Sequence, residues 1–178
     1  MRIKSKWNKR AKPQSIEEIA KAVGFISWQI ATNSLLELEN SGYETNNQIQ
    51  RLKTIQEFLV FLLQVADRLV YEKLNTDQRR IFITTLALHV ADTLVDNQKD
   101  FGDFTGKDAF IDLLNQCSED YSELNFNNGE AGFDFLRYFG ERIAIVIQDN
   151  HFVSQQIVDI EGPDIVAKLQ KGISGLFS

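Results

Sequence analysis

Proline, cysteine and methionine are scarce in this sequence, and so is glycine over its first hundred residues. The 178 residues include two prolines, one cysteine and one methionine. The prolines stand at positions 13 and 163, so none interrupts residues 14–162, and only Gly24 and Gly42 precede Gly102. Because proline and glycine are the residues least compatible with a helix interior, their scarcity favours long helices joined by few tight turns.

A single cysteine and short apolar runs also limit where the protein can work. Cys117 has no second cysteine with which to form an intramolecular disulfide or a thiolate metal site, which is typical of a reducing compartment. The longest wholly apolar run, residues 58–63, has six residues, whereas a helix needs about 20 to cross a bilayer. No apolar signal segment follows the basic N-terminus. We therefore expect a cytoplasmic protein without a transmembrane segment.

Acidic residues are missing from the first 12 positions, where six of the 19 basic residues gather. This segment contains Trp7 and the cations Arg2, Lys4, Lys6, Lys9, Arg10 and Lys12. The rest of the chain holds 13 basic and 25 acidic residues, so a basic arm precedes an acidic body. We expect a flexible arm over residues 1–14 and a single all-α domain over residues 15–178.

Local signals predict several helix boundaries. Ser15 and Glu18 have the spacing of a capping box, and Gly42 suits the left-handed position after a helix C-terminus, so a first helix is expected between them. Asp77 is expected to cap a later helix. Apolar residues recur at helical spacing in four further segments, which predict helices at about 45–74, 77–95, 107–124 and 130–148.

Two segments near the C-terminus leave alternatives. Residues 143–147 are rich in β-branched side chains and fit a helix or a short buried strand, although the helical spacing of their flanks favours a helix. Residues 151–160 have no clear pattern, and Pro163 suits the first position of a last helix that ends near Leu176. The predicted fold is an all-α bundle of about six helices, with a hairpin of the second and third helices at its centre.

Residues 58–63 are apolar on every face of the second predicted helix. A helix of this kind is normally covered on all sides, either in the centre of a bundle or against another subunit. We therefore take Phe58 and Phe61 as candidate interaction residues, and a homodimer as the favoured assembly.

The third predicted helix places His89, Asp92 and Asp96 along one face. Because His89 and Asp92 are three residues apart, their side chains can meet, as in an acid–base or metal site. A di-iron bundle would need two Glu-x-x-His motifs, and the sequence has none. The favoured interpretation is a solvated helix face or a histidine at the edge of the core, and the metal site is kept as the alternative.

The polar loop that follows, residues 96–107, resembles two ligand-binding motifs and matches neither. The order of its carboxylates and glycines does not fit a calcium-binding EF-hand loop. Gly102 and Gly106 are separated by three residues, whereas a phosphate-binding loop needs four before its lysine. We expect a connecting loop held to the body by Phe101 and Phe104.

No motif for nucleophilic catalysis, zinc hydrolysis or dinucleotide binding is present, and no cofactor is expected. The favoured hypothesis is therefore a non-enzymatic helical interaction or regulatory module that binds a partner protein or itself. One alternative is a small-molecule or metal-dependent enzyme that uses the His89 face. The other is a nucleic-acid-associated protein that acts through the basic arm, and the acidic body makes this the less favoured partner.

Overall fold

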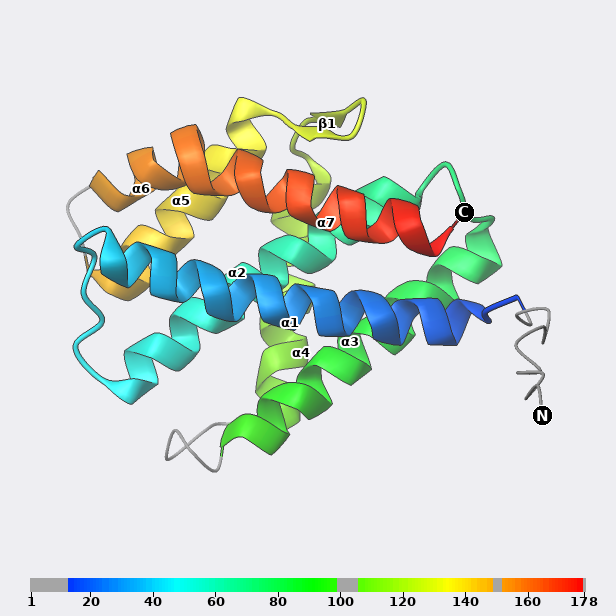
Figure 1. The fold of residues 1–178 in the computed structure, drawn as a ribbon, viewed down its shortest axis with the longest axis horizontal. Helices are drawn as coiled ribbons and strands as arrows, with labels where there is room; N and C mark the ends of the chain where they lie inside the picture. Colours follow the sequence, from blue (N-terminus) through cyan, green and yellow to red (C-terminus); the bar gives the residue numbers. More distant parts are fainter. Residues whose placement is uncertain (1–12, 99–105, 149–151, 178) are drawn as a thin grey trace, which may run out of the picture.

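The computed structural model describes residues 13–98, 106–148 and 152–177. The first four helices are α1 (Ile16–Asn40), α2 (Gln48–Val70), α3 (Thr76–Gln98) and α4 (Gly106–Ser122). A minimal hairpin follows, β1 (Phe126–Asn127) and β2 (Glu130–Ala131), and then α5 (Phe133–Ile147). The last helical run consists of α6 (Phe152–Gln156), the π-helix η1 (Ile157–Glu161) and α7 (Gly162–Leu176). With this run counted once, the described chain holds six helices in one bundle, which confirms the predicted all-α fold (Figure 1).

Both predicted ends of α1 are confirmed by their hydrogen bonds. The Ser15 hydroxyl accepts from the backbone N–H of Glu18 at 3.1 Å, and the Glu18 carboxylate accepts from the backbone N–H of Ser15 at 2.8 Å. At the other end Gly42 has a φ of +93°. The N–H of Tyr43 donates to the carbonyl of Leu38, which completes the Schellman motif that glycine permits.

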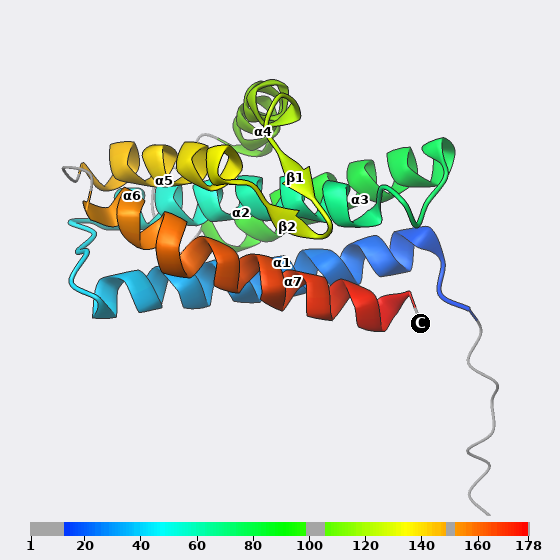
Figure 2. The ribbon, with the colours of Figure 1, turned by 90° about the horizontal axis from the view of Figure 1, so that it is seen from above.

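Helix α2 occupies the middle of the bundle. It packs against α1, α3, α4, α5 and α7, and α3 lies in turn against α1 and α4. Helices α1 and α7 run antiparallel beside each other along the long axis of the molecule (Figure 1). Helix α4 is seen nearly end-on in Figure 2 and stands outside the other helices. In the α2–α3 hairpin, the central helix α2 is therefore connected to α3, which forms one side of the bundle.

The apolar segment 58–63 is covered by helices of its own chain. None of its six side chains is more than 3% exposed. The ring of Phe61 stacks on that of Phe139 of α5 with 4.0 Å between centroids, and Phe58 meets Phe139 edge-on at 5.3 Å. Because Phe58 and Phe61 are fully buried in the monomer, they form no surface for a partner. The expectation of a dimer interface at this segment is therefore wrong.

The starts of α3 and α5 differ from the sequence-based predictions. Helix α3 begins at Thr76, and Asn75 caps it by accepting a hydrogen bond from the N–H of Gln78 at 2.9 Å. The predicted cap, Asp77, lies inside the first turn instead. Helix α5 begins at Phe133, because the segment before it forms the β1–β2 hairpin. Residues 143–147 are helical, so the favoured alternative is confirmed.

The tip of the hairpin is the turn Asn128–Gly129. Both residues have positive φ, 54° and 77°, which is the backbone of a type I′ turn and explains the Asn-Gly pair. A side chain added at Gly129 would collide with the amide group of Gln170. The missing side chain thus lets the hairpin lie directly on α7.

Pro163 lies within a continuous helical run, where the sequence had predicted the start of a separate helix. Proline lacks an N–H and clashes with the carbonyl four residues earlier in a regular α-helix. Here the preceding turn is the π-helix η1, in which the N–H of Gly162 donates to the carbonyl of Ile157 five residues before it. The wider turn makes room for the proline ring, so residues 152–176 form one helix instead of two.

Among the described residues, no helix is both long and apolar enough to cross a membrane.

Candidate interaction groove

A groove lies over the C-terminal half of α2. Its floor is formed by residues of α2 and of the turn after it, between Leu63 and Lys73, and its walls come from α3, α4, the β1–β2 hairpin and α7. The groove has a volume of about 1310 Å³, larger than the roughly 300–1,000 Å³ of typical small-molecule pockets. It therefore has room for a segment of polypeptide.

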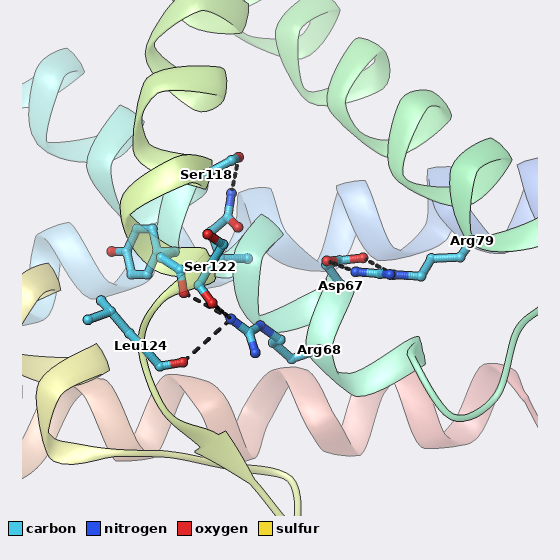
Figure 3. Close-up of polar contacts among 8 residues, drawn as sticks. Asp67, Arg68, Arg79, Ser118, Ser122 and Leu124 are labelled. Atoms are coloured by element: carbon cyan, nitrogen blue, oxygen red, sulfur yellow. Dashed lines mark hydrogen bonds and ion pairs between the residues drawn. The ribbon is translucent and has the colours of Figure 1, made fainter. Parts of the chain in front are cut away.

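The polar side chains on the floor are bound to the walls. The Gln64 amide donates to the Ser118 hydroxyl of α4 at 2.6 Å, and Ser118 donates in turn to the carbonyl of Leu114 at 2.7 Å. Arg68 reaches the C-terminal end of α4 and donates to the carbonyls of Tyr121 at 2.9 Å and Ser122 at 3.3 Å (Figure 3). Carbonyls in the last turn of a helix have no partner inside it, so Arg68 satisfies them and complements the helix dipole.

Asp67 connects the floor to α3. Its carboxylate accepts two hydrogen bonds from Arg79, at 2.6 Å from Nε and 2.5 Å from Nη2 (Figure 3). This hydrogen bonding raises the pKa of Arg79. The guanidinium also lies over the ring of Tyr71, with 4.9 Å to its centroid. Because two hydrogen bonds join Asp67 of the floor to Arg79 of α3, the floor and the α3 wall are held in place relative to each other.

The two ends of the groove differ in chemistry. Near the α2–α3 turn, its lining includes Lys73, Arg79 and Arg80. Further along, apolar side chains stand among the polar Gln64, Thr84, Asn115 and Ser118. The apolar ones are Leu63 from α2, Ile83, Ala87 and Leu88 from α3, and Ile111 and Leu114 from α4. Leu88 is 43% exposed and Tyr71 is 62% exposed, so both ends carry a large apolar group that a ligand could cover.

The charge of the groove is opposite to that of the body. Four basic side chains and two acidic ones, Asp67 and Glu72, line it, whereas the chain beyond residue 12 has 13 basic and 25 acidic residues. Of the four cations, Arg68 and Arg79 are already bound as described. Lys73 lies 6.0 Å from the centroid of the Phe177 ring, and Arg80 is 3.6 Å from Asp77 in a highly exposed pair. Lys73 and Arg80 can therefore turn towards a ligand.

The predicted polar face of α3 is not assembled as a site. His89 packs against α1, where a side chain added at Gly24 would lie 2.5 Å from the His89 ring. Asp92 forms an ion pair with Lys107 of α4 at 2.6 Å, and Asp96 is exposed. Among the described residues, no three metal-ligating side chains are close enough to hold an ion. His89 thus lies at the α1–α3 contact, and Asp92 joins α3 to α4.

Two other predictions lie outside the described residues. They are the interaction role of the basic arm (Arg2, Lys4, Lys6, Trp7, Lys9, Arg10 and Lys12) and the packing of Phe101 and Phe104 in the loop after α3.

A second polar cluster joins α2, α4 and α5 within the bundle. The Glu57 carboxylate accepts hydrogen bonds from Nε and Nη2 of Arg142, at 2.6 and 2.7 Å. Beside this pair, the Tyr138 hydroxyl donates to Asp120 at 2.6 Å. Cys117 is 1% exposed, and burial raises the pKa of its thiol. A buried, protonated thiol is a poor nucleophile, so the cluster ties three helices together instead of forming a reactive site.

Sequence reasoning missed the groove because its walls come from distant segments. One trace of it can be found in α3, where Thr76, Arg80, Ile83 and Ala87 share a helix face that mixes a cation with apolar residues. That stripe has the same spacing as an ordinary amphipathic helix. Only the positions of α4 and α7 show that part of it lines a groove.

The chain was compared with models of known protein families, with curated proteins and with solved structures, and none of the three comparisons gives a match.

Proposed function

We propose that this protein is a non-enzymatic helical interaction module that binds a segment of a partner protein in the groove over α2. The observation that supports this proposal is the groove itself, about 1310 Å³ in volume and bordered by four other elements. Its lining combines exposed apolar groups with reachable cations, as protein-binding surfaces do.

The state of the ionisable groups favours binding over catalysis. Asp67, Arg68 and Arg79 are bound to groups that hold the walls in place. A proton-transfer group must be able to reach a substrate and change its charge, whereas these side chains have structural partners. A rigid, preorganised surface instead lowers the entropic cost of binding. The buried, unpaired Cys117 supports a reducing compartment such as the cytoplasm.

A selection from a random peptide library tests this proposal. The full chain serves as bait, together with two variants that add a tryptophan to an exposed helical position. Thr84→Trp fills the groove from the α3 wall, and Gln29→Trp changes α1 outside the groove. Selected peptides should bind the wild type and Gln29→Trp equally and bind Thr84→Trp at least about tenfold more weakly.

Circular dichroism of both variants provides the control for folding. If no peptide is enriched, or if the enriched peptides bind Thr84→Trp as well as the wild type, the groove is not a protein-binding site.

A further inference from the structure

We infer that the segment held in the groove is an acidic amphipathic helix. This inference rests on the proposed function and adds the chemistry of the occupant, which follows from the charge of the lining, the order of its polar and apolar parts, and the state of its backbone groups.

The charge of the lining favours an acidic ligand. The groove has four basic and two acidic side chains in a body where acidic residues are nearly twice as frequent as basic ones. The carboxylates of Asp67 and Glu72 reduce this local charge but leave an excess of cations. Since Lys73 and Arg80 are exposed, carboxylates of a ligand can reach them without breaking the internal Asp67–Arg79 pair.

The order of the lining fits a helix with two different faces. Cations stand near the α2–α3 turn, and the partly exposed apolar side chains of Ile83, Leu88 and Ile111 follow along the walls. A helix with apolar residues on one face can cover the apolar part, because such residues recur every three or four positions. Acidic residues that flank this face would then meet Lys73 and Arg80.

The backbone of the walls argues against an extended ligand. Most of the groove is bordered by helices, whose N–H and C=O groups are already bonded within each helix, apart from the α4 carbonyls that Arg68 satisfies. The outer edges of the β1–β2 hairpin are free but only two residues long on each strand, too short to pair along the length of an extended segment. An extended peptide would leave its own backbone groups without protein partners, whereas a helix satisfies them internally.

Other occupants fit these observations less well. A nucleic acid would bring many phosphates next to an acidic body, which repels them beyond the groove. A second copy of this chain could offer the outer face of α4, which is acidic at Asp108, Asp112 and Glu119. That face lacks the row of apolar side chains that the far end of the groove would have to bury. Both occupants are treated as outcomes of the test.

The test uses a displayed library of helical peptides about four turns long. Each peptide has a fixed leucine face, and its flanking positions are randomised among Glu, Gln and Lys. The full chain, Thr84→Trp, Arg80→Glu and the control Lys21→Glu are the baits. Lys21 is an exposed cation of α1 outside the groove.

On the wild type and on Lys21→Glu, Glu should be selected over Lys at the flanks by at least about tenfold, and this preference should weaken with added salt. On Arg80→Glu the preference should fall or turn towards Lys. Isothermal calorimetry of one selected peptide and of its Gln-substituted version then measures the same difference in solution.

The outcomes separate this inference from the proposed function. Peptides that lose binding to Thr84→Trp but show no preference for Glu keep the groove as a binding site and overturn the acidic helix. If Thr84→Trp binds every selected peptide as well as the wild type does, the proposed function fails, and the inference fails with it. Two further results would also overturn the acidic helix. One is a single-stranded oligonucleotide that displaces the peptides, and the other is a dimer, seen by light scattering, that Thr84→Trp abolishes.

Discussion

The ion pair between Glu57 of α2 and Arg142 of α5 allows a quantitative test of how the bundle is held together. Its two hydrogen bonds are short, 2.6 and 2.7 Å, and the side chains of Glu57 and Arg142 are 6% and 27% exposed. Removing one partner of a buried pair costs about 3–5 kcal/mol, because the other charge loses its partner. Replacing both partners by apolar residues removes that cost and is often nearly neutral.

Unequal burial of the two partners predicts unequal costs. Glu57→Leu leaves Arg142, whose guanidinium keeps some contact with water and lies 6.0 Å from the centroid of the Tyr138 ring. We expect Glu57→Leu to lower the free energy of unfolding by about 3 kcal/mol. Arg142→Met leaves a carboxylate with almost no access to water, so a loss of about 4–5 kcal/mol is expected. The double variant should lie within about 2 kcal/mol of the wild type.

Urea unfolding at pH 7, followed by circular dichroism, gives the four free energies of the cycle. Glu44→Gln, which changes an exposed carboxylate, serves as the control and should alter stability by less than about 0.5 kcal/mol. If the two single losses add up in the double variant to within about 0.5 kcal/mol, the two residues are not energetically coupled. A larger loss for Glu57→Leu than for Arg142→Met would refute the argument from burial.

Two further predictions concern the core and the pH dependence of stability. Phe61→Ala should lower the free energy of unfolding by about 3–5 kcal/mol, because it removes a fully buried ring from an aromatic cluster. The melting temperature should not depend on protein concentration, and a concentration dependence would show that a second chain also contributes to this core. Glu161→Gln should stabilise the protein at pH 7, because burial raises the pKa of the Glu161 carboxyl above its ordinary 4.5 and makes its ionised form unfavourable. In urea titrations across pH, this gain should disappear below pH 4.5, where the wild-type side chain is protonated in both states, and a gain that persists there would contradict the explanation.

Features with local causes could be predicted from the sequence. Ser15 and Glu18 are three residues apart, and Gly42 follows the C-cap residue of its helix, so both ends of α1 can be identified without knowing the rest of the fold. The Asn128–Gly129 pair is also a local signal, for a type I′ hairpin, although no hairpin is among the predicted elements. The choice of Asp77 over Asn75 failed because neighbouring polar residues are equally suitable as caps.

Features that depend on distant segments could not be predicted in this way. Residues 151–160 have no clear pattern because η1 adds a residue to one turn and shifts the helical stripe that continues into α7. The pattern of residues 58–63 correctly indicated burial on all faces, but it does not say whether the same chain or another provides the cover. The groove depends on the positions of α2, α3, α4 and α7 together, which helical periodicity does not specify.

The central place of α2 has a consequence for synthesis of the chain. Its apolar segment 58–63 is covered in part by α5, which ends at Ile147, and α2 as a whole also packs against α7, further along the chain. At about 5–20 residues per second, a ribosome needs on the order of ten seconds to make the intervening chain. During that interval Phe58 and Phe61 are attached to a nascent chain that lacks Phe139 of α5, on which both rings pack. Chaperones that bind apolar segments would therefore meet this helix first, and fragments that stop before α5 should aggregate.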